Sequence, residues 1–107
     1  MSRATTFRKQ GTFLVLMALL ESSKHGYEVA KFIEEKSNGF FRMPFGTLYP
    51  ILHRLEKEGF VKVKFDDKDT LKAKKVYTLT KKGNALCKDE VADFNLFSLA
   101  IKKMVPT

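Results

Sequence analysis

The segment GTLYPILHRLEKEGFVKVKF, residues 46–65, changes its hydrophobic period partway along its length. Its first part repeats apolar residues every three or four positions, a spacing typical of a helix with one buried face. The apolar positions of that face are Leu48, Leu52 and Leu55, with Ile51 beside them. After Gly59, apolar residues alternate with lysines, which is typical of a strand with one face toward a core. The segment therefore predicts a helix over residues 46–58 that Gly59 ends, followed by a strand.

Two further helices are predicted before this segment. Residues 12–22 are apolar on more than one side, and the predicted principal face comprises Phe13, Leu16, Met17 and Leu20, with Leu14 and Leu19 beside it. The helix over residues 26–37 is predicted to direct inward Tyr27, Ala30 and Ile33, with Val29 and Phe32 at the sides. Gly39 ends it, because glycine readily adopts the left-handed conformation. Residues 1–10 are interpreted as a polar, basic lead before the first helix.

A β-hairpin and a long helix are predicted after the segment. The first strand carries three apolar residues on one face, Val61, Val63 and Phe65. Residues 66–70 form a turn, and residues 74–79 return with Tyr77 and Leu79 inward. Thr80 is the expected N-cap of a last helix that reaches about Val105. This order predicts a mainly α fold with a small β-hairpin: a winged helix-turn-helix over residues 1–80 and a C-terminal helix over residues 81–107.

Composition limits the classes of protein to which the chain can belong. It has 107 residues, enough for one domain, and 44% of them are hydrophobic, which is typical of a globular chain. Its single cysteine, Cys87, excludes an internal disulfide. The longest apolar run, residues 13–20, is too short to span a bilayer, which takes about 20 residues. We therefore expect a cytoplasmic protein that does not associate with a membrane.

The sequence contains no constellation of residues that indicates catalysis. His25 and His53 are the only histidines, and their spacing does not match a metal-binding motif such as HExxH. Cys87 lies within an amphipathic pattern, where a lone cysteine is more often packed than reactive. No glycine-rich phosphate-binding loop is present. We predict that the protein is not an enzyme and that it has no cofactor and no metal.

By charge alone, the chain favours an anionic partner, with nucleic acid the first candidate and a membrane surface the second; the predicted partner is DNA and not a membrane. The formal net charge is +8, and the stretch from Lys62 to Lys75 carries six lysines against three aspartates. Clustered lysines suit the neutralisation of phosphates, and a helix such as that over residues 46–58 fits a DNA major groove. The predicted DNA contacts are Thr47, Tyr49, His53, Arg54, Lys57, Lys68, Lys72, Lys74 and Lys75. A merely solvated surface, or a protein-interaction module that binds an acidic partner, is the alternative.

The last predicted helix carries an apolar stripe that one small domain has little room to bury. The predicted dimer interface combines this stripe with the first helix and comprises Phe13, Leu14, Phe94, Phe97, Ile101 and Met104. A two-fold axis here would set two DNA-binding helices one DNA turn apart, which suits a palindromic operator. Packing of the stripe against the first helix is the alternative, and both arrangements can hold together.

Three motifs resemble those of the PadR-like transcriptional regulators. They are HGYE at residues 25–28, GTLYPILHRLEKEG at residues 46–59 and YTLTKKG at residues 77–83. The resemblance runs from about Gly11 to Gly83 and implies a homodimeric winged-helix repressor that binds double-stranded DNA through the third helix and the wing. It places Thr47, Tyr49 and His53 on the DNA side, and it adds Tyr27 as a residue close to the DNA backbone.

The same resemblance implies regulation by a small molecule. Family members often respond to small aromatic or hydrophobic effectors through a dimerising C-terminal region. The chain resembles the short branch of the family, which has a single C-terminal helix, and it contains no tryptophan to stack on a flat ligand. Phe94 and Phe97 are therefore the candidate effector-binding residues. A drug-binding protein with incidental DNA affinity is a further alternative.

Overall fold

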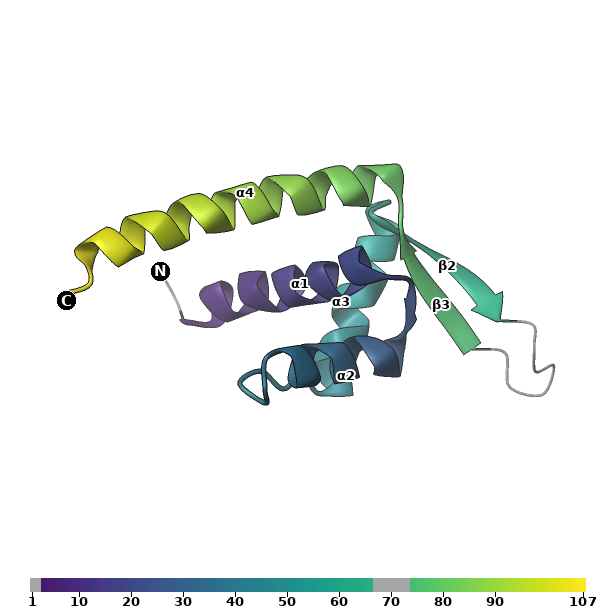
Figure 1. The fold of residues 1–107 in the computed structure, drawn as a ribbon. Helices are drawn as coiled ribbons and strands as arrows, with labels where there is room; N and C mark the ends of the chain where they lie inside the picture. The colour runs from purple at the N-terminus through teal and green to yellow at the C-terminus, as the bar shows by residue number, and fades with distance from the viewer. Residues whose placement is uncertain (1–2, 67–73) are drawn as a thin grey trace.

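The computed structural model describes the backbone of residues 3–66 and 74–107 and the side chains of residues 10–66 and 74–107. Four helices and three strands lie in these ranges (Figure 1). In chain order they are α1 (Arg3–Glu21), β1 (Lys24–His25), α2 (Gly26–Lys36), α3 (Phe45–Lys57), β2 (Val61–Asp66), β3 (Lys74–Leu79) and α4 (Lys81–Met104). The predicted winged helix-turn-helix, mainly α with a small hairpin, is confirmed.

Two features differ from the predicted elements. Helix α1 begins at Arg3 rather than at Thr12, because extending a helix costs far less than nucleating one and polar residues can continue it outside the core. The sequence does not predict the short strand β1, since two residues are too few to show an alternating pattern. This strand pairs antiparallel with β3, so the sheet has three strands in the order β1-β3-β2.

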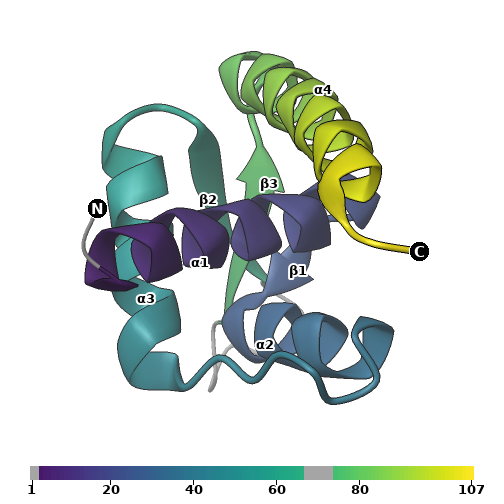
Figure 2. The ribbon, with the colours of Figure 1, turned by 90° about the vertical axis from the view of Figure 1, so that its left-hand side faces the viewer.

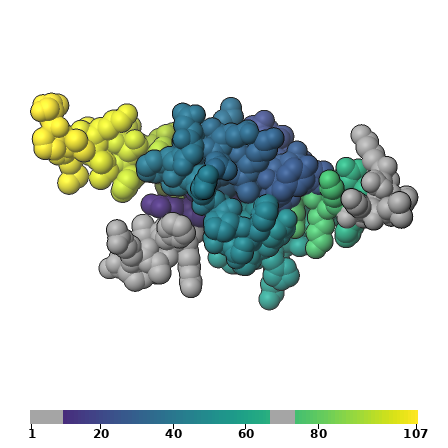
Figure 3. Space-filling model, turned by 90° about the horizontal axis from the view of Figure 1, so that it is seen from below, coloured from purple at the N-terminus to yellow at the C-terminus, as the bar shows by residue number. Residues whose placement is uncertain are grey.

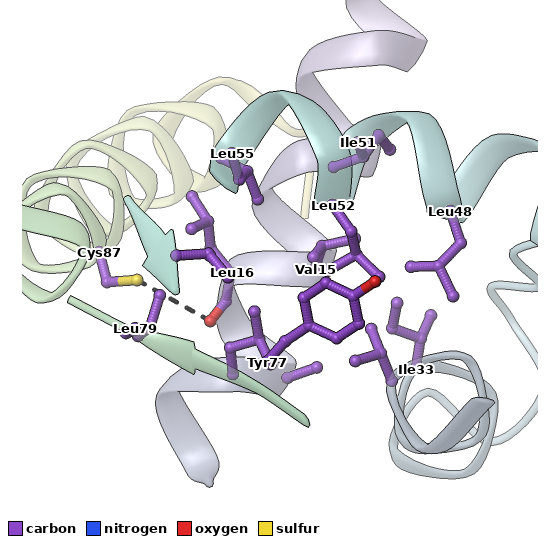
Figure 4. Close-up of a cluster of buried hydrophobic side chains, with 14 residues drawn as sticks. Val15, Leu16, Ile33, Leu48, Ile51, Leu52, Leu55, Tyr77, Leu79 and Cys87 are labelled. Carbon is purple, nitrogen blue, oxygen red and sulfur yellow. Dashed lines mark hydrogen bonds between the residues drawn. The ribbon is translucent and has the colours of Figure 1, made fainter. Parts of the chain in front are cut away.

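The core lies around α1, which crosses the domain with α2 below it and α4 above it (Figures 1 and 2). The buried residues of α1 are Val15, Leu16, Ala18 and Leu19. The predicted stripe of α3 is buried as well, and Figure 4 shows Leu52 and Tyr77 pointing into the same cluster. Cys87 of α4 completes it, with its thiol 3.8 Å from the carbonyl oxygen of Leu16. Burial raises the pKa of the Cys87 thiol, which is therefore a packed and protonated group.

The structure corrects the inward faces predicted for two helices. In α2 the buried residues are Val29 and Ile33, one turn apart, whereas Tyr27 is 49% exposed. Six positions separate Tyr27 from Ile33, so the two cannot share a narrow helical face. In α1 the predicted principal face is wrong in part: Leu16 is buried as predicted, but Leu20 is exposed, and Val15 and Ala18 are buried instead. Small side chains let neighbouring helices approach most closely, and a pattern weighted by large apolar residues overlooks them.

The junction between β3 and α4 is tightly packed. Thr80 caps α4 as predicted, its hydroxyl accepting a hydrogen bond from the Gly83 amide at 3.1 Å. The Thr80 amide donates to the carbonyl oxygen of Phe60 at 3.0 Å, which ties the helix to the turn before β2. A Cβ atom at Gly83 would lie 2.0 Å from that same oxygen. The first turn of α4 is therefore held directly against the base of the hairpin.

The buried side chain of Lys24, the first residue of β1, caps the C-terminal end of α1. Lys24 is 7% exposed, and its ammonium donates to the carbonyl oxygen of Ala18 and to the hydroxyl of Ser22, both at 2.8 Å. Its hydrogen bond to the carboxylate of Glu21, together with one from Ser22, holds the pKa of that carboxyl below its ordinary value of 4.5. The Lys24 nitrogen also lies 4.7 Å from the centre of the Phe32 ring. One cation thus satisfies the last turn of α1 and anchors the start of β1.

We expect Lys24→Met to lower the free energy of unfolding by about 1.5–3 kcal/mol, because hydrogen bonds made by a charged group are lost. Lys31→Met is the matched control, since Lys31 is exposed and its ion pair with Glu35 spans 4.0 Å. That control should change stability by less than about 0.5 kcal/mol. Urea denaturation followed by circular dichroism compares the two, and equal losses would contradict the capping role of Lys24.

Candidate nucleic-acid interface

The outward face of α3 is fixed by its buried leucines. Successive helical residues are about 100° apart, so the positions opposite the stripe are Gly46, Pro50, His53 and Lys57, all of them exposed. Tyr49 lies on the flank toward α2, where its ring meets Gly26. Arg54 lies on the flank toward α1. The predicted contacts His53 and Lys57 therefore point directly away from the core.

A cleft of about 300 Å³ opens between the start of α2, the side of α3 and strand β3 of the hairpin. Its lining comprises His25, Gly26, Tyr27, Tyr49, Lys74, Lys75 and Tyr77. Four of the predicted DNA contacts are thus brought together from three elements: Tyr27, Tyr49, Lys74 and Lys75. Figure 3 views the molecule from below, where α2, α3 and the strands lie side by side on one face.

Aromatic contacts position the two exposed tyrosines of the cleft. The Tyr27 ring is parallel to the His25 ring, with centroids 5.8 Å apart, and the Lys74 nitrogen lies 5.5 Å from the centre of the Tyr27 ring. The Tyr49 hydroxyl lies so close to α2 that a Cβ atom at Gly26 would be 2.7 Å from it. Both rings are therefore held by neighbours, although about half of each remains exposed.

The floor of the cleft is a neutral phenol. Tyr77 of β3 is buried, and this burial raises the pKa of its hydroxyl, with Tyr49 and Glu56 nearby adding to the shift. Tyr77 stays protonated at physiological pH and places no negative charge beneath Lys74 and Lys75. The cleft therefore presents two lysine side chains beside aromatic rings, a combination that suits an anion.

His25 joins α2 to the hairpin. Its Nδ1 lies 3.2 Å from the carbonyl oxygen of Lys75, and its Nε2 lies 3.7 Å from the carboxylate of Asp66. Its backbone amide donates to the Glu28 carboxylate at 2.8 Å, which secures the first turn of α2. This positioning role of His25 is not predicted from the sequence, where the spacing of the two histidines bears only on a metal site. The feature of the sequence that could have indicated this role is the place of His25 in the HGYE motif, not the chemistry of its side chain.

The hairpin extends the basic surface beyond the cleft. Strands β2 and β3 pair antiparallel, from Val61 opposite Leu79 to Asp66 opposite Lys74. The exposed lysines on these strands are Lys62, Lys64, Lys74 and Lys75. The predicted contacts Lys68 and Lys72 lie outside the described residues, as does most of the predicted turn.

Two predicted contacts lie apart from the cleft. The Arg54 guanidinium donates to the hydroxyl of Thr12 in α1, with 2.5 Å between Nη2 and Oγ1. Thr47 is half-buried and lines a separate hollow of about 160 Å³ beside α1 and the α2–α3 connection. Both residues therefore belong to the α1 side of α3, and the structure does not bring them together with the lysines of the hairpin.

The residues predicted for a dimer interface and an effector site lie along α1 and α4. The rings of Phe13 and Phe94 stack within the chain, with centroids 5.7 Å apart, so this part of α4 packs onto α1. Leu14 is half-buried beside the hollow that Thr47 lines. Helix α4 extends past the start of α1 (Figure 1), and the exposed apolar residues that follow Phe94 are Leu96, Phe97, Leu99, Ile101 and Met104, with Val105 directly after the helix.

Among the described side chains, those of residues 10–66 and 74–107, no group of three or more histidine, cysteine, aspartate or glutamate residues is placed to hold a metal ion. None of the helices described is long and apolar enough to cross a membrane.

Comparisons with known proteins find one family model and several similar structures. The model of the transcriptional regulator PadR-like family matches residues 15–89. A transcriptional regulator from Clostridium thermocellum has a similar structure, with a TM-score of 0.83 and 25% identity, covering 99% of this chain and 100% of that one. The negative transcriptional regulator PadR of Bacillus subtilis strain 168 is 30% identical over 71 residues, 66% of this chain and 39% of that protein. The crystal structure of Bacillus subtilis PadR in complex with operator DNA has a TM-score of 0.67 and 28% identity, covering 75% of this chain and 46% of that one.

The contact between Gly26 and Tyr49 gives a test of the cleft that needs no DNA. We expect Gly26→Ala to destabilise the protein by about 1–3 kcal/mol, because the added methyl displaces the Tyr49 ring. In a Tyr49→Ala background the same change should be neutral or stabilising by up to about 1 kcal/mol, because the obstacle is gone and alanine favours helix. Urea denaturation of the four proteins measures the coupling. Additive effects would show that the two residues do not meet.

Proposed function

The chain belongs to the PadR-like family of transcriptional regulators, and we propose that it is a homodimeric repressor that binds a palindromic operator. The observation that carries this proposal is the cleft in which Tyr27, Tyr49, Lys74 and Lys75 converge beside the outward face of α3. Similarity to a negative regulator whose structure contains operator DNA supports it. A DNA-binding regulator acts where the chromosome is, so we propose a cytoplasmic location as well.

Operator binding divides between base edges and phosphates. The outward face of α3 enters the major groove, where Tyr49, His53 and Lys57 reach base edges or phosphates. Lys74, Lys75 and the Tyr27 hydroxyl bind the sugar–phosphate backbone, joined by Lys68 and Lys72 from the hairpin. Thr47 and Arg54 contribute from the α1 side of α3, Arg54 after exchanging its bond to Thr12 for a phosphate.

The second half of α4 is proposed to form the dimer interface. Its exposed apolar residues include Phe97, at 65% exposure, Ile101 and Met104, and nothing within the described part of the same chain covers them. The stacked rings of Phe13 and Phe94 lie at the inner end of this surface, so an interface would continue from α1 along α4. Leu14, which lies beside the hollow that Thr47 lines, is proposed to extend the interface on α1. A dimer with two-fold symmetry buries this apolar surface of both copies and presents two α3 helices to one face of the DNA. In this proposal residues 1–80 form the DNA-binding domain and residues 81–107 the dimerisation helix.

We also propose that a small aromatic or hydrophobic effector releases the operator. Phe94 already stacks on Phe13, which supports the packing of flat rings at this part of α4. A ligand between the paired α4 helices, beside Phe94 and Phe97, would change the angle between the two copies and hence the separation of their α3 helices.

The direct test is selective binding to the protein's own promoter. A labelled promoter fragment should be retarded at nanomolar protein in the presence of excess random DNA, and footprinting should reveal two half-sites related by a dyad. Equal affinity for promoter and random DNA would contradict the proposed function and favour a module that binds acidic partners in general.

We expect Lys74→Ala to weaken binding to operator and to random DNA by similar factors, because a lysine on a phosphate carries no sequence information. It should also flatten the slope of log K against log salt concentration by about one. Lys88→Ala, which removes an exposed lysine of α4, is the matched control and should leave the slope unchanged. Filter binding between 50 and 200 mM salt, roughly the range in which such slopes are measured, compares the three proteins. An unchanged slope for Lys74→Ala would place that lysine away from the DNA.

We expect the double change Phe97→Asp and Ile101→Asp to give a folded monomer with poor operator affinity, because two buried apolar contacts become charged in each copy. Light scattering at micromolar concentration measures the mass, and circular dichroism checks that the helices persist. The exposed pair Lys102→Asp and Lys103→Asp on the same helix tests whether added negative charge alone has this effect. A wild-type monomer, or a dimeric double variant, would contradict the proposed interface.

A further inference from the structure

The first turn of α3 exposes an aromatic ring that lies outside the hydrophobic core. Phe45 is 53% exposed, and in the fully described helix α3 only Phe45 and Tyr49 are large hydrophobic residues that remain exposed. Their rings lie one turn apart with centroids 5.8 Å from each other, so they form a continuous aromatic step along the flank of the helix. An exposed phenylalanine at this point contributes little to the core, and its apolar edge is available to a partner.

The surroundings of Phe45 differ from those of the basic cleft. The ring borders a second hollow, of about 500 Å³, between α2 and the start of α3. The cations of that hollow are both paired: Arg42 with Glu34 at 2.9 Å, and Lys31 with Glu35 at 4.0 Å. The hollow is therefore close to neutral, whereas Lys74 and Lys75 rim the cleft on the other side of Tyr49. A phosphate would favour the cleft, and an apolar group would favour the place beside Phe45.

The position of Phe45 on α3 is one from which a base edge can be reached. Recognition helices present their N-terminal residues to base edges in the major groove. Gly46 follows Phe45, and a Cβ atom built there meets no atom within 4 Å, so the first turn is bare beside the ring and can approach DNA closely. Helix α4 runs along the top of Figure 1, whereas α3 begins near α2 at the bottom, so a dimer through the far end of α4 leaves Phe45 uncovered.

We infer that Phe45, supported by Tyr49, reads the 5-methyl group of a thymine in the operator half-site. The thymine methyl is the apolar group that the major groove displays, and phenylalanine is among the side chains that contact it. This inference rests on the proposed function, since it assigns one base position within the same protein–DNA interface. It makes Phe45 a specificity-determining residue, distinct from the lysines that hold phosphates.

Uracil scanning tests the inference with the unmodified protein. Each thymine of a footprinted half-site is replaced in turn by deoxyuridine, which removes only the methyl group. At one position the wild-type affinity should fall about fourfold, which corresponds to about 0.8 kcal/mol for one buried methyl group at 1.4 kcal/mol per tenfold change. Phe45→Ala should bind the thymine operator more weakly and should bind the thymine and uracil operators equally at that position.

Two further variants separate methyl recognition from a general loss of packing. Phe45→Leu keeps an apolar side chain and should retain part of the preference for thymine. Phe40→Ala removes an exposed phenylalanine of the α2–α3 connection and should leave the preference unchanged. Selective operator binding with no thymine position sensitive to uracil would overturn the inference and leave the proposed function standing. A uracil effect that persists in Phe45→Ala would also overturn it, and the absence of any selective DNA binding would overturn both.

Discussion

Burial of Leu48, Leu52 and Leu55 against α1 is the constraint on which the functional surface depends. These side chains are at most 1% exposed, and a helix so anchored has no freedom to rotate about its axis. Its opposite side must then face outward, with Tyr49 turned toward α2 and Arg54 toward α1. The direction of every polar side chain on α3 follows from a contact that is itself entirely apolar.

The second constraint is the pairing of β1 with β3. Because β1 leads directly into α2, this pairing fixes the position of α2 relative to the hairpin. The side chain of Lys24 contacts the end of α1, and the side chain of His25 contacts both the backbone of β3 and the carboxylate of Asp66. Without that pairing, Tyr27 of α2 and Lys74 of β3 would have no fixed relation. The cleft is therefore a product of a two-residue strand, and its aromatic and cationic groups are preorganised before any ligand arrives.

The parts of this structure that the sequence predicts are those with a strong local period. The α3 stripe, the alternation of Val61 and Val63, and the Thr80 cap all follow from spacing or from one residue's chemistry. Phe65, predicted on the same face as Val61, is 59% exposed, because it lies at the end of β2 beyond the core. The inward face of α2 and the strand β1 do not, because they depend on which neighbours pack closely rather than on pattern. For the candidate site, exposed cations and tyrosines could be named in advance. The contacts of His25 and the role inferred for Phe45 depend on which residues the fold brings together and which surfaces it leaves open.

The close contact between Gly83 and the carbonyl of Phe60 turns α4 into a lever. Because no side chain separates the first turn of this helix from the base of the hairpin, the two must tilt as one body. The helix has 24 residues and is about 36 Å long, so a tilt of about 5° displaces its far end by about 3 Å. In a dimer joined at that far end, the reverse also holds: a change of crossing angle swings each hairpin and its α3 through a comparable arc. In such a dimer, the distance between the two α3 helices depends on the angle at which the far ends of the two α4 helices cross.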